Sequence, residues 1–568
     1  MKLGSGVGGS DLDRYHHRVV PDYFDLGSYR RAVTTSSPLA ATWAQRGLVW
    51  SYAFNHEEAV ACFERAVAAD PDCALGYWGI AYALGPNYNK PWETFEAGEA
   101  RAAVVRARQA VAQAEQCATG ASAAERALIA ALRHRYPSVH VEADTSAWNR
   151  EYAEAMRTAY QSHPDDLDIA VLFADALMNL TPWELWDIVT GQPADGAATT
   201  EIRTVLERAL ASPAGQAHPG ALHLYIHLME MSPQPEDALW AGELLRALVP
   251  DAGHLLHMPT HLDVLCGDYE QVVASNEAAI RADGRFVAQQ SNSSFYTLYR
   301  VHNYHFKAYG AMFLGRFSAA LEAADALADT IPESLLRVQV PPMADWLEGF
   351  VSIRVHVLIR FGRWQELIDS PFPADPQLYC VTTAMLHYGK SLACAATGQL
   401  ASARAHHRQF ASAAAAVPAS RTIFNNTTQD ILQVAGAMLD GELAYRAGDI
   451  EAGFAHLRHA IELDDGLPYD EPWAWMQPTR HALGALLLEQ GRVVEAESVY
   501  RADLGLDATL PRPCQHPGNV WSLHGYHECL TRLGRHDQVR IIADQLRIAA
   551  ARADVPISAS CYCRTSSP

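Results

Sequence analysis

Helical periodicity punctuated by glycines is the feature that most constrains the fold of this 568-residue chain. Apolar residues recur at three- and four-residue spacing over nearly the whole length, and no stretch shows the sustained alternation typical of a β-strand. Glycines mark the turns, and each is followed by an alanine-rich amphipathic segment: Gly267, Gly315, Gly362, Gly398, Gly448, Gly491 and Gly534. The sequence therefore predicts an all-α protein.

One segment shows the length of the repeat. Small residues at positions 47 and 59 let two helices approach, an aromatic ring fills the gap between them, and a proline closes the unit: Trp43, Gly47, Ala59, Phe63, Ala66 and Pro71. On these residues the chain resembles the tetratricopeptide repeat superfamily, whose unit is about 34 residues long. The resemblance implies an α-solenoid superhelix of roughly ten to twelve helical hairpins.

The repeats extend over most of the chain, so we expect one continuous solenoid with two halves. The N-terminal half covers residues 36–335 and the C-terminal half covers residues 336–550. We expect a lead-in over residues 1–35 and a flexible tail over residues 551–568.

Composition limits the classes of partner. The net charge is −21, from 44 basic and 65 acidic residues, which argues against nucleic acid or an anionic membrane as the partner. No apolar run approaches the roughly 18 residues of a transmembrane helix. The ten cysteines are scattered without paired spacing, except for Cys561 and Cys563, so we expect reduced thiols and a cytoplasmic location.

Histidines gather in three nearby segments, HLYIHLME, GHLLHMPTH and HNYHF. Within each segment these histidines, and one carboxylate, are three or four residues apart, which places them on one helix face. The set is His223, His227, Glu230, His254, His257, His261, His302 and His305. The tetratricopeptide resemblance implies that all eight lie at groove-facing positions of three consecutive repeats.

Imidazoles with one carboxylate suit a transition metal ion, and we favour Fe or Cu, with Zn or Mn possible. We expect five metal ligands: His227, Glu230, His257, His261 and His305. The remaining three histidines would orient the ligands or carry protons as catalytic groups: His223, His254 and His302. Eight candidates exceed the three or four ligands of one ion, so the number of ions stays open.

Two sets of motifs lie outside the cluster. NHEEA at the turn of the first repeat is interpreted as a helix cap, while the aromatic insertion YDEPWAWMQPTRH, with Glu471 and His481, is either core or a substrate-positioning loop. Together NHEEA, GPNYN, GHLLHMPTH and HNYHF resemble a group of microbial tetratricopeptide proteins. That resemblance supports the architecture and implies no reaction.

The function that these patterns favour is a metal-dependent enzyme. It would oxidise a small organic molecule in the groove with O₂, while loops 86–93 and 469–477 shield the site. Two alternatives remain open: a scaffold that binds a peptide or protein partner, and a metallohydrolase or isomerase. The oligomeric state is left open.

Overall fold

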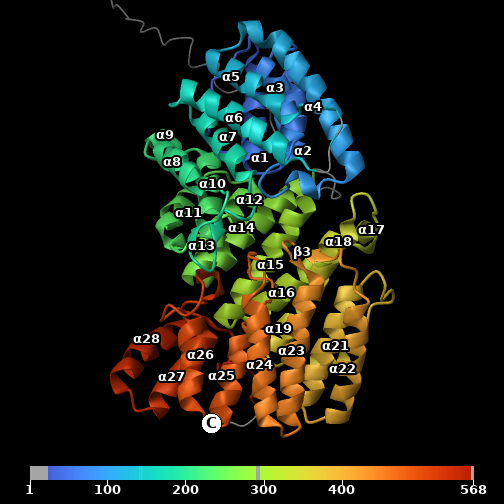
Figure 1. Ribbon diagram of the computed structural model, residues 1–568, viewed down its shortest axis with the longest axis vertical. Helices are drawn as coiled ribbons and strands as arrows, with labels where there is room; N and C mark the ends of the chain where they lie inside the picture. Colours follow the sequence, from blue (N-terminus) through green and yellow to red (C-terminus); the bar gives the residue numbers. More distant parts are fainter. Residues whose placement is uncertain (1–22, 140, 142–143, 290–294, 565–568) are drawn as a thin grey trace, which may run out of the picture.

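The computed structural model describes residues 23–139, 141, 144–289 and 295–564. Within these ranges successive helices stack side by side into one continuous array, from the blue N-terminal helices to the red C-terminal ones (Figure 1). The expected all-α solenoid is confirmed. The helices that build the array up to the middle of the chain are α1 (Pro38–Tyr52), α2 (His56–Ala69), α3 (Ala74–Ala83), α4 (Ala97–Cys117), α5 (Ala123–Leu132), α6 (Ser146–Ser162), α7 (Leu167–Met178), α8 (Thr199–Leu210), α9 (Pro213–Gln216), α10 (Pro219–Glu230), α11 (Leu239–Leu245), α12 (Gly253–His257), α13 (Pro259–Cys266) and α14 (Tyr269–Val287).

The second part of the array continues in the same way to the C-terminal region. Its helices are α15 (Tyr296–Leu314), α16 (Phe317–Asp329), α17 (Glu333–Leu336), α18 (Met343–Leu347), α19 (Ile353–Arg360), α20 (Trp364–Asp369), α21 (Cys380–Ala396), α22 (Leu400–Ala415), α23 (Thr428–Arg446), α24 (Ile450–Asp465), α25 (Thr479–Glu489), α26 (Val493–Asp503), α27 (Val520–Arg532) and α28 (His536–Arg552). Short 3₁₀ turns lie between helices at η2 (Trp92–Thr94), η3 (Ala118–Gly120), η4 (Arg133–Arg135), η5 (Pro235–Ala238), η6 (Glu348–Ser352) and η7 (Arg512–Cys514). Among the described residues the β-strands form two small antiparallel hairpins, β1 (Trp186–Asp187) with β2 (Gln192–Pro193) and β3 (Thr422–Ile423) with β4 (Asn426–Thr427).

The predicted glycine turns occur where the sequence places them. Gly267 ends α13 with φ of 79° and Gly315 ends α15 with φ of 74°. This left-handed conformation costs little only for glycine, because glycine has no Cβ. The other glycines of the predicted set also have positive φ.

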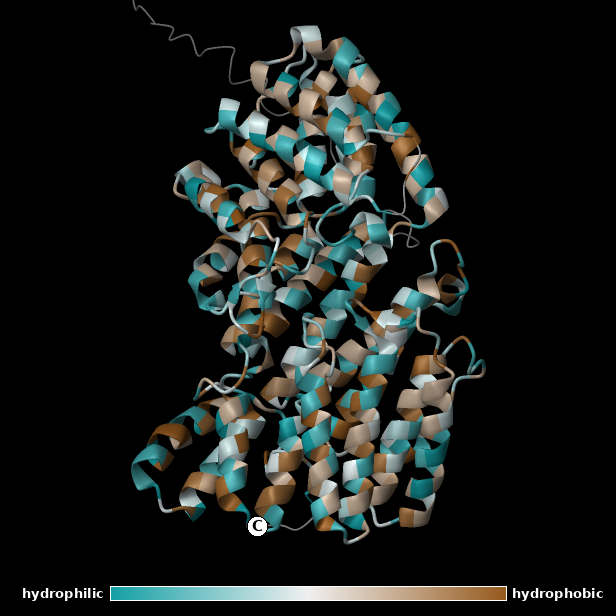
Figure 2. Ribbon diagram, viewed as in Figure 1, coloured by the Kyte–Doolittle hydropathy of each residue, from teal (hydrophilic) through white to brown (hydrophobic). Residues whose placement is uncertain are grey.

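Packing between paired helices follows the repeat pattern. A Cβ added at Gly47 on α1 would lie 2.7 Å from the ring of Phe63 on α2, so the absence of a side chain lets that ring fill the gap. Figure 2 shows apolar and polar residues interleaved along each helix, as expected for helices with one buried face. The core is therefore spread along the array instead of forming one central mass.

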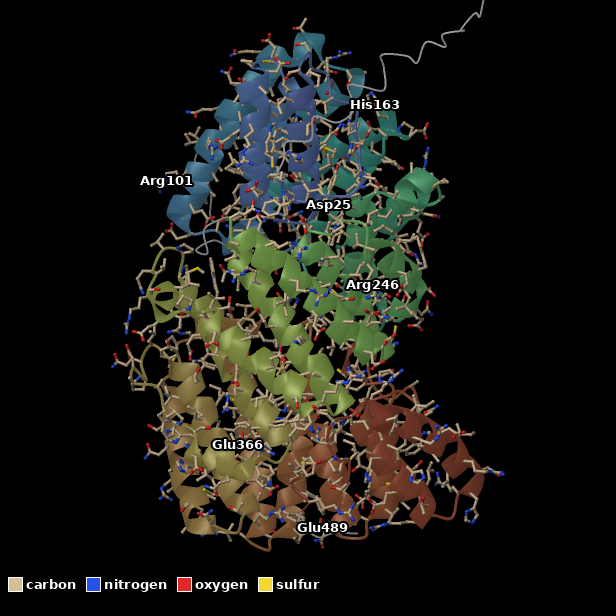
Figure 3. The ribbon with its side chains drawn as sticks, turned by 180° about the vertical axis from the view of Figure 1, so that it is seen from behind. Asp25, Arg101, His163, Arg246, Glu366 and Glu489 are labelled. Carbon is tan, nitrogen blue, oxygen red and sulfur yellow. A yellow bond between two sulfur atoms is a disulfide. The ribbon has the colours of Figure 1, made fainter. Side chains whose placement is uncertain are left out.

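The lead-in is anchored where it is described. Phe24 packs against Trp50 and Phe286, with ring centroids 5.6 and 5.5 Å away. Asp25 lies at the junction between the N-terminal helices and the middle of the chain (Figure 3). There its backbone N–H donates to the Asp251 carboxylate at 2.7 Å.

The C-terminal segment differs from the expected flexible tail. The Asp554 carboxylate accepts the backbone N–H groups of Phe317 and Ser318 at 2.6 and 2.9 Å, which caps the start of α16. The Ser560 carbonyl accepts a hydrogen bond from Arg360. These polar anchors hold residues 553–564 against the array; residues 565–568 lie outside the described residues.

Two other expectations concern the thiols and the membrane. Cys561 and Cys563 form a disulfide, which differs from the expectation that all thiols are reduced. In the part of the chain that the structure describes, no helix combines the length and the apolar character needed to cross a bilayer.

Candidate metal centre

Four helices in the middle of the array carry the histidine set. Helix α10 carries His223, His227 and Glu230; α12 carries His254 and His257; α13 carries His261; α15 carries His302 and His305. Each of the eight side chains is only 0–8% exposed, so the set lies inside the array and not on an open groove. Buried imidazoles require partners, because an unpaired polar group loses its hydrogen bonds to water.

The GHLLHMPTH segment is divided into two short helices. Helix α12 ends at His257 and α13 begins at Pro259. Proline has no N–H to donate and therefore interrupts an α-helix. The sequence pattern treated this segment as one helix, but His257 and His261 still meet, with their Nε2 atoms 2.7 Å apart.

The described histidines and carboxylates form three groups in which the ligand atoms lie within 4.8 Å of one another. The groups are His223 with His227 and His254, His257 with His261 and His302, and His227 with Glu230 and His261. Nitrogen ligands about 2.0–2.1 Å from one ion are about 3.3 Å apart in a tetrahedral site. The Nε2 atoms of His223 and His254 are 3.1 Å apart, which is close to this value.

Hydrogen bonds at the far side of the rings determine which nitrogen is available to a metal. The Nδ1 atom of His223 lies 2.6 Å from the carbonyl of Tyr52, and Nδ1 of His257 lies 2.7 Å from Oδ1 of Asn276. A carbonyl oxygen can only accept, so each Nδ1 carries the proton and each Nε2 keeps its lone pair. Histidines that bind metals are held in this way.

Glu230 holds two further rings. Its Oε1 accepts from Nδ1 of His227 at 2.8 Å, and its Oε2 accepts from Nδ1 of His261 at 2.5 Å. The Nε2 atom of His227 is buried and has no hydrogen-bond partner among the described residues. Glu230 is therefore placed as the carboxylate behind two imidazoles, although its oxygens also lie close enough to belong to the third group.

Burial keeps most of these imidazoles neutral. Desolvation lowers the pKa of His223 to about 3. Desolvation, reinforced by neighbouring imidazoles, holds the pKa of His227, His254 and His302 well below the ordinary value. A neutral imidazole keeps the lone pair that a metal ion needs, so the donor set fits a transition metal ion at neutral pH.

The pKa of His261 is shifted in the opposite direction, above its ordinary value. Burial disfavours its charged form, but the carboxylates of Glu471 and Glu230 outweigh this and raise its pKa to about 10. Glu471 Oε2 lies 2.7 Å from His261 Nδ1 and forms an ion pair with it. Glu471 is only 3% exposed, so the charge of His261 offsets the cost of burying this carboxylate.

A cavity of about 500 Å³ adjoins the group formed by His257, His261 and His302. His261 and His302 line it, together with Glu471, and its walls include Trp183 and Tyr299. The first group (His223, His227 and His254) does not line this cavity. Of the two three-histidine groups, only the second is open to a molecule that enters there.

The structure does not bring His305 into any of the three groups. Its Nε2 lies 2.8 Å from the sulfur of Met476. Residues four positions apart on a helix point in more similar directions than residues three positions apart. Phe306, four positions after His302, therefore lies beside it in place of His305, which is three positions after it. The ring of Phe306 stacks on His261 with centroids 5.3 Å apart, in the place that the sequence pattern assigned to His305.

The two predicted shielding loops do contact the centre. In loop 86–93, the ring of Tyr88 is fully buried with its centroid 5.0 Å from that of His227. Loop 469–477 brings Glu471 to His261. The insertion motif YDEPWAWMQPTRH indicated a functional role for Glu471 only weakly, because the sequence left open whether this loop belongs to the core or positions a substrate.

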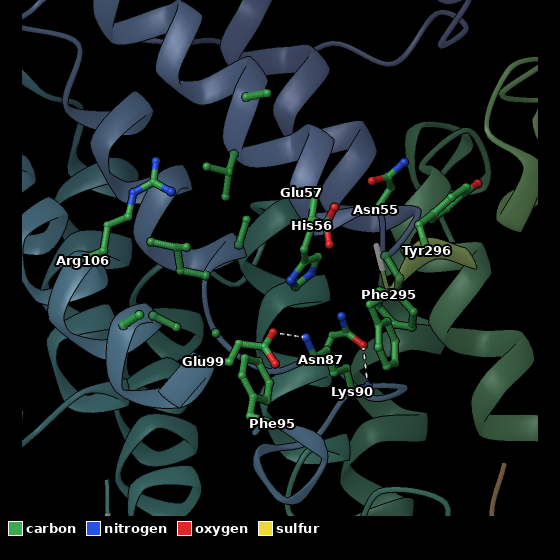
Figure 4. Close-up of a pocket in the computed structure, with 18 of the residues that line it drawn as sticks. Asn55, His56, Glu57, Asn87, Lys90, Phe95, Glu99, Arg106, Phe295 and Tyr296 are labelled. Carbon is green, nitrogen blue, oxygen red and sulfur yellow. Dashed lines mark hydrogen bonds and ion pairs between the residues drawn. The ribbon is translucent and has the colours of Figure 1, made fainter. Parts of the chain in front are cut away.

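A second cavity of about 480 Å³ is lined by residues of the NHEEA turn (Figure 4). Asn55 caps α2, as expected, by accepting the N–H of Glu58 at 3.3 Å. His56 points into this cavity, and Lys90 binds Glu99 at 2.5 Å across it. Phe54, which also lines the cavity, has φ of 54° and separates it from the histidines.

Comparisons with known proteins give no family assignment. No family model matches the chain, and curated protein sequences give no match. Among solved structures, a human IFIT1 dimer with m7Gppp-AAAA is 10% identical over 91% of this chain and 92% of that chain, with a TM-score of 0.30. A monomeric IFIT1 mutant with the same ligand is 9% identical over 91% of each chain (TM-score 0.31), and Naa15/Naa10 bound to HypK-THB is 13% identical over 90% of this chain and 74% of that chain (TM-score 0.20).

These structures correct the expectation about partners. Helical chains that align with most of this one were solved with m7Gppp-AAAA or with a protein partner. The negative charge and the solenoid fold therefore do not restrict the partner to a small molecule or exclude nucleic acid. TM-scores of 0.20 to 0.31 are too low to transfer any ligand to this chain.

Proposed function

We propose that the protein is a metal-dependent enzyme whose metal ion is held by His257, His261 and His302. The observation that carries the proposal is that this three-histidine group is buried and also forms part of the wall of a 500 Å³ cavity. Three protein ligands leave a coordination position open for a reacting molecule. The cavity limits the size of the reacting group and leaves the size of the whole substrate open.

The donor set favours Fe or Cu, with Zn or Mn possible, because neutral imidazoles dominate it. When bound, such an ion supplies Lewis-acid chemistry and, for Fe or Cu, electron transfer to O₂. Asn276 fixes the ring of His257, and Glu230 fixes that of His261, so the protein sets the direction of both lone pairs. His257 therefore needs little reorganisation to bind the ion, whereas His261, whose pKa is raised to about 10, would release its Nε2 proton as the ion binds.

Glu471 would handle protons at the cavity wall. Its carboxylate is buried, is paired with Nδ1–H of His261 at 2.7 Å and lines the same cavity as His261 and His302. Nδ1 of His261 already carries a proton, so Glu471 can accept a proton from a group that enters the cavity and hold it on its own carboxylate. Aromatic side chains in the cavity wall, among them Trp183 and Phe424, would limit the access of water to the ion, which favours oxidation of the substrate group with O₂.

Both halves of the chain would build the site. The half over residues 36–335 carries the histidines, and the half over residues 336–550 supplies Glu471 and the β3–β4 hairpin. Phe424 in that hairpin packs on His302 with ring centroids 4.7 Å apart. The C-terminal half would therefore supply part of the cavity wall, including Phe424 and Glu471.

Metal content and O₂ reactivity test the proposal together. Protein loaded anaerobically with Fe(II) or Cu(I) should be oxidised on exposure to O₂ at a rate that falls at least tenfold in His302→Ala. The control is His407→Ala, which removes a partly exposed imidazole bonded to Asp440; this variant should react like the wild type. Equal rates in all three proteins would contradict the proposal.

One alternative has a specific observation in its favour. A carboxylate beside a metal site, as Glu471 is beside the histidine group, can also act as the general base of a metallohydrolase or isomerase. Stoichiometric metal without any O₂ reactivity would favour this alternative over oxidation. Absence of metal would instead favour a scaffold that binds a partner.

A further inference from the structure

We propose that the chain binds a second metal ion at His223, His227 and His254, so that the centre holds two ions. This inference rests on the proposed function, because it adds an ion behind the one that faces the cavity. The two sets of three ligands share no residue, and each set has its ring nitrogens within 4.8 Å of one another. Each set can therefore serve its own ion.

Hydrogen bonding alone does not satisfy the second set. Nδ1 of His223 donates to the carbonyl of Tyr52, and Nδ1 of His227 donates to Glu230, so both Nε2 atoms are acceptors. His254 has one proton to give in its neutral form. It can donate from Nε2 to His223 at 3.1 Å, which leaves Nε2 of His227 without a donor.

A cation satisfies all three rings at once. The lone pairs of His223 and His227 are directed by their far-side partners, and His254 can turn its own lone pair inward because its Nδ1 has no hydrogen-bond partner among the described residues. Three neutral imidazoles without a direct carboxylate suit a transition metal of borderline softness such as Cu, Zn, Co or Fe. Alkaline-earth ions, which require oxygen ligands, do not fit.

Glu230 links the two sets. It accepts from His227 in one set and from His261 in the other. The ring centroids of those two histidines are 5.7 Å apart, and those of His254 and His257 are 6.0 Å apart. The two ions would therefore be neighbours with a shared carboxylate behind them, and not separate sites in distant parts of the array.

The second ion would be closed off from both cavities, since none of its three ligands lines either of them. The ring centroid of Phe54 lies 4.5, 5.9 and 5.6 Å from those of His223, His227 and His254. Phenylalanine seldom adopts the positive φ that Phe54 has here. The same ring lines the second cavity, so it lies between that cavity and the histidines.

Cobalt titration of the full-length chain tests the proposal. Protein stripped with EDTA is titrated with CoCl₂, and the visible absorption of bound Co(II) is followed to its end point. We expect two equivalents for the wild type, one for His254→Ala and one for His302→Ala. The control His407→Ala should keep two, and circular dichroism checks that each variant is folded.

The outcomes separate the two proposals. One equivalent in the wild type, kept in His254→Ala and lost in His302→Ala, would overturn the second ion and leave the proposed function standing. No binding in the wild type would overturn both. If His254→Ala fails to fold, the wild-type end point still decides, and His223→Gln, which keeps a side chain of similar size, replaces it as the one-ion variant.

Discussion

Glu471 Oε2 lies 2.7 Å from Nδ1 of His261, although the two residues lie far apart in the sequence. The contact brings loop 469–477 against the histidine set on the earlier helices. The carboxylate is buried, so this ion pair is shielded from water. The candidate centre therefore depends on distant parts of the chain, and changes in either part should affect it.

Removing the carboxylate behind two imidazoles should weaken metal binding. In Glu230→Gln the side chain keeps its size but loses the charge that accepts Nδ1–H of both His227 and His261. Loss of such a partner typically lowers metal affinity about 10- to 100-fold. Competition with a coloured chelator measures the affinity. Glu442→Gln, which changes a buried carboxylate bound to Arg446, should bind metal like the wild type.

Glu471→Gln should separate metal binding from reactivity. Nδ1 of His261 remains bonded to Glu230, so we expect the metal content to stay at the wild-type level. The rate of oxidation of the loaded protein by O₂ should fall at least tenfold, because the cavity loses its proton acceptor. If Glu471→Gln also loses its metal, Glu471 is itself a metal ligand. Elemental analysis and stopped-flow absorption measure the two quantities.

The start of α10 depends on Asp168. Nδ1 of His218 accepts the N–H of Ala221, so Nε2 of His218 carries the proton and faces the Asp168 carboxylate at 3.3 Å. Burial alone would raise the pKa of Asp168, but the hydrogen bond from His218 and the charge of Arg31 outweigh it and hold the pKa well below the usual range. The ionised carboxylate thus anchors the helix that carries His223.

This lowered pKa predicts a pH-dependent contribution to stability. A carboxylate with a lower pKa in the folded state stabilises the fold above its unfolded pKa of about 3.9, and the contribution is lost as the pH falls below that value. Asp168→Asn should therefore reduce the free energy of unfolding by about 3 kcal/mol at pH 7, because it removes one of the two carboxylates paired with the buried Arg31. Urea unfolding should show a smaller difference at pH 3. An equal difference at both pH values would contradict the argument.

The C-terminal segment should contribute to stability through Asp554. Its carboxylate accepts two N–H groups at the start of α16, where the adjacent chain supplies no side-chain cap. Asp554→Ala should cost about 1 kcal/mol, the usual value for a lost helix cap. The control Asp544→Ala removes a surface carboxylate of α28 and should be neutral. Urea unfolding that shows no difference between the two variants would mean that the segment is not anchored through this residue.

Much of the fold follows from local patterns in the sequence. The positions of the turns were predictable because glycine adopts a positive φ at little cost, as at Gly267 and Gly315. The meeting of His257 with His261 was predictable from spacing, and it holds even though Pro259 divides the segment into two helices. Spacing on adjacent helices was enough to bring seven of the eight predicted residues into the three groups: His223, His227, Glu230, His254, His257, His261 and His302.

The remaining features depend on tertiary contacts. His305 is one turn from His302, but a three-residue step differs enough in direction that Phe306 takes the place beside the histidines. Glu471 arrives from a loop far along the chain, and nothing in helix periodicity indicates its partner. The role of Glu230 behind the imidazoles could not be inferred either, because spacing does not distinguish a ligand from a residue that holds a ligand.

X-ray absorption spectroscopy of the protein, purified with the metal it acquires in the cell, tests the central claim most directly. We predict a transition metal edge with nitrogen neighbours about 2.0–2.1 Å from the metal and the outer-shell scattering typical of imidazole rings. Both features should weaken in a variant that carries His257→Gln and His261→Gln. A sample without metal, or a metal spectrum without imidazole scattering, would contradict the account.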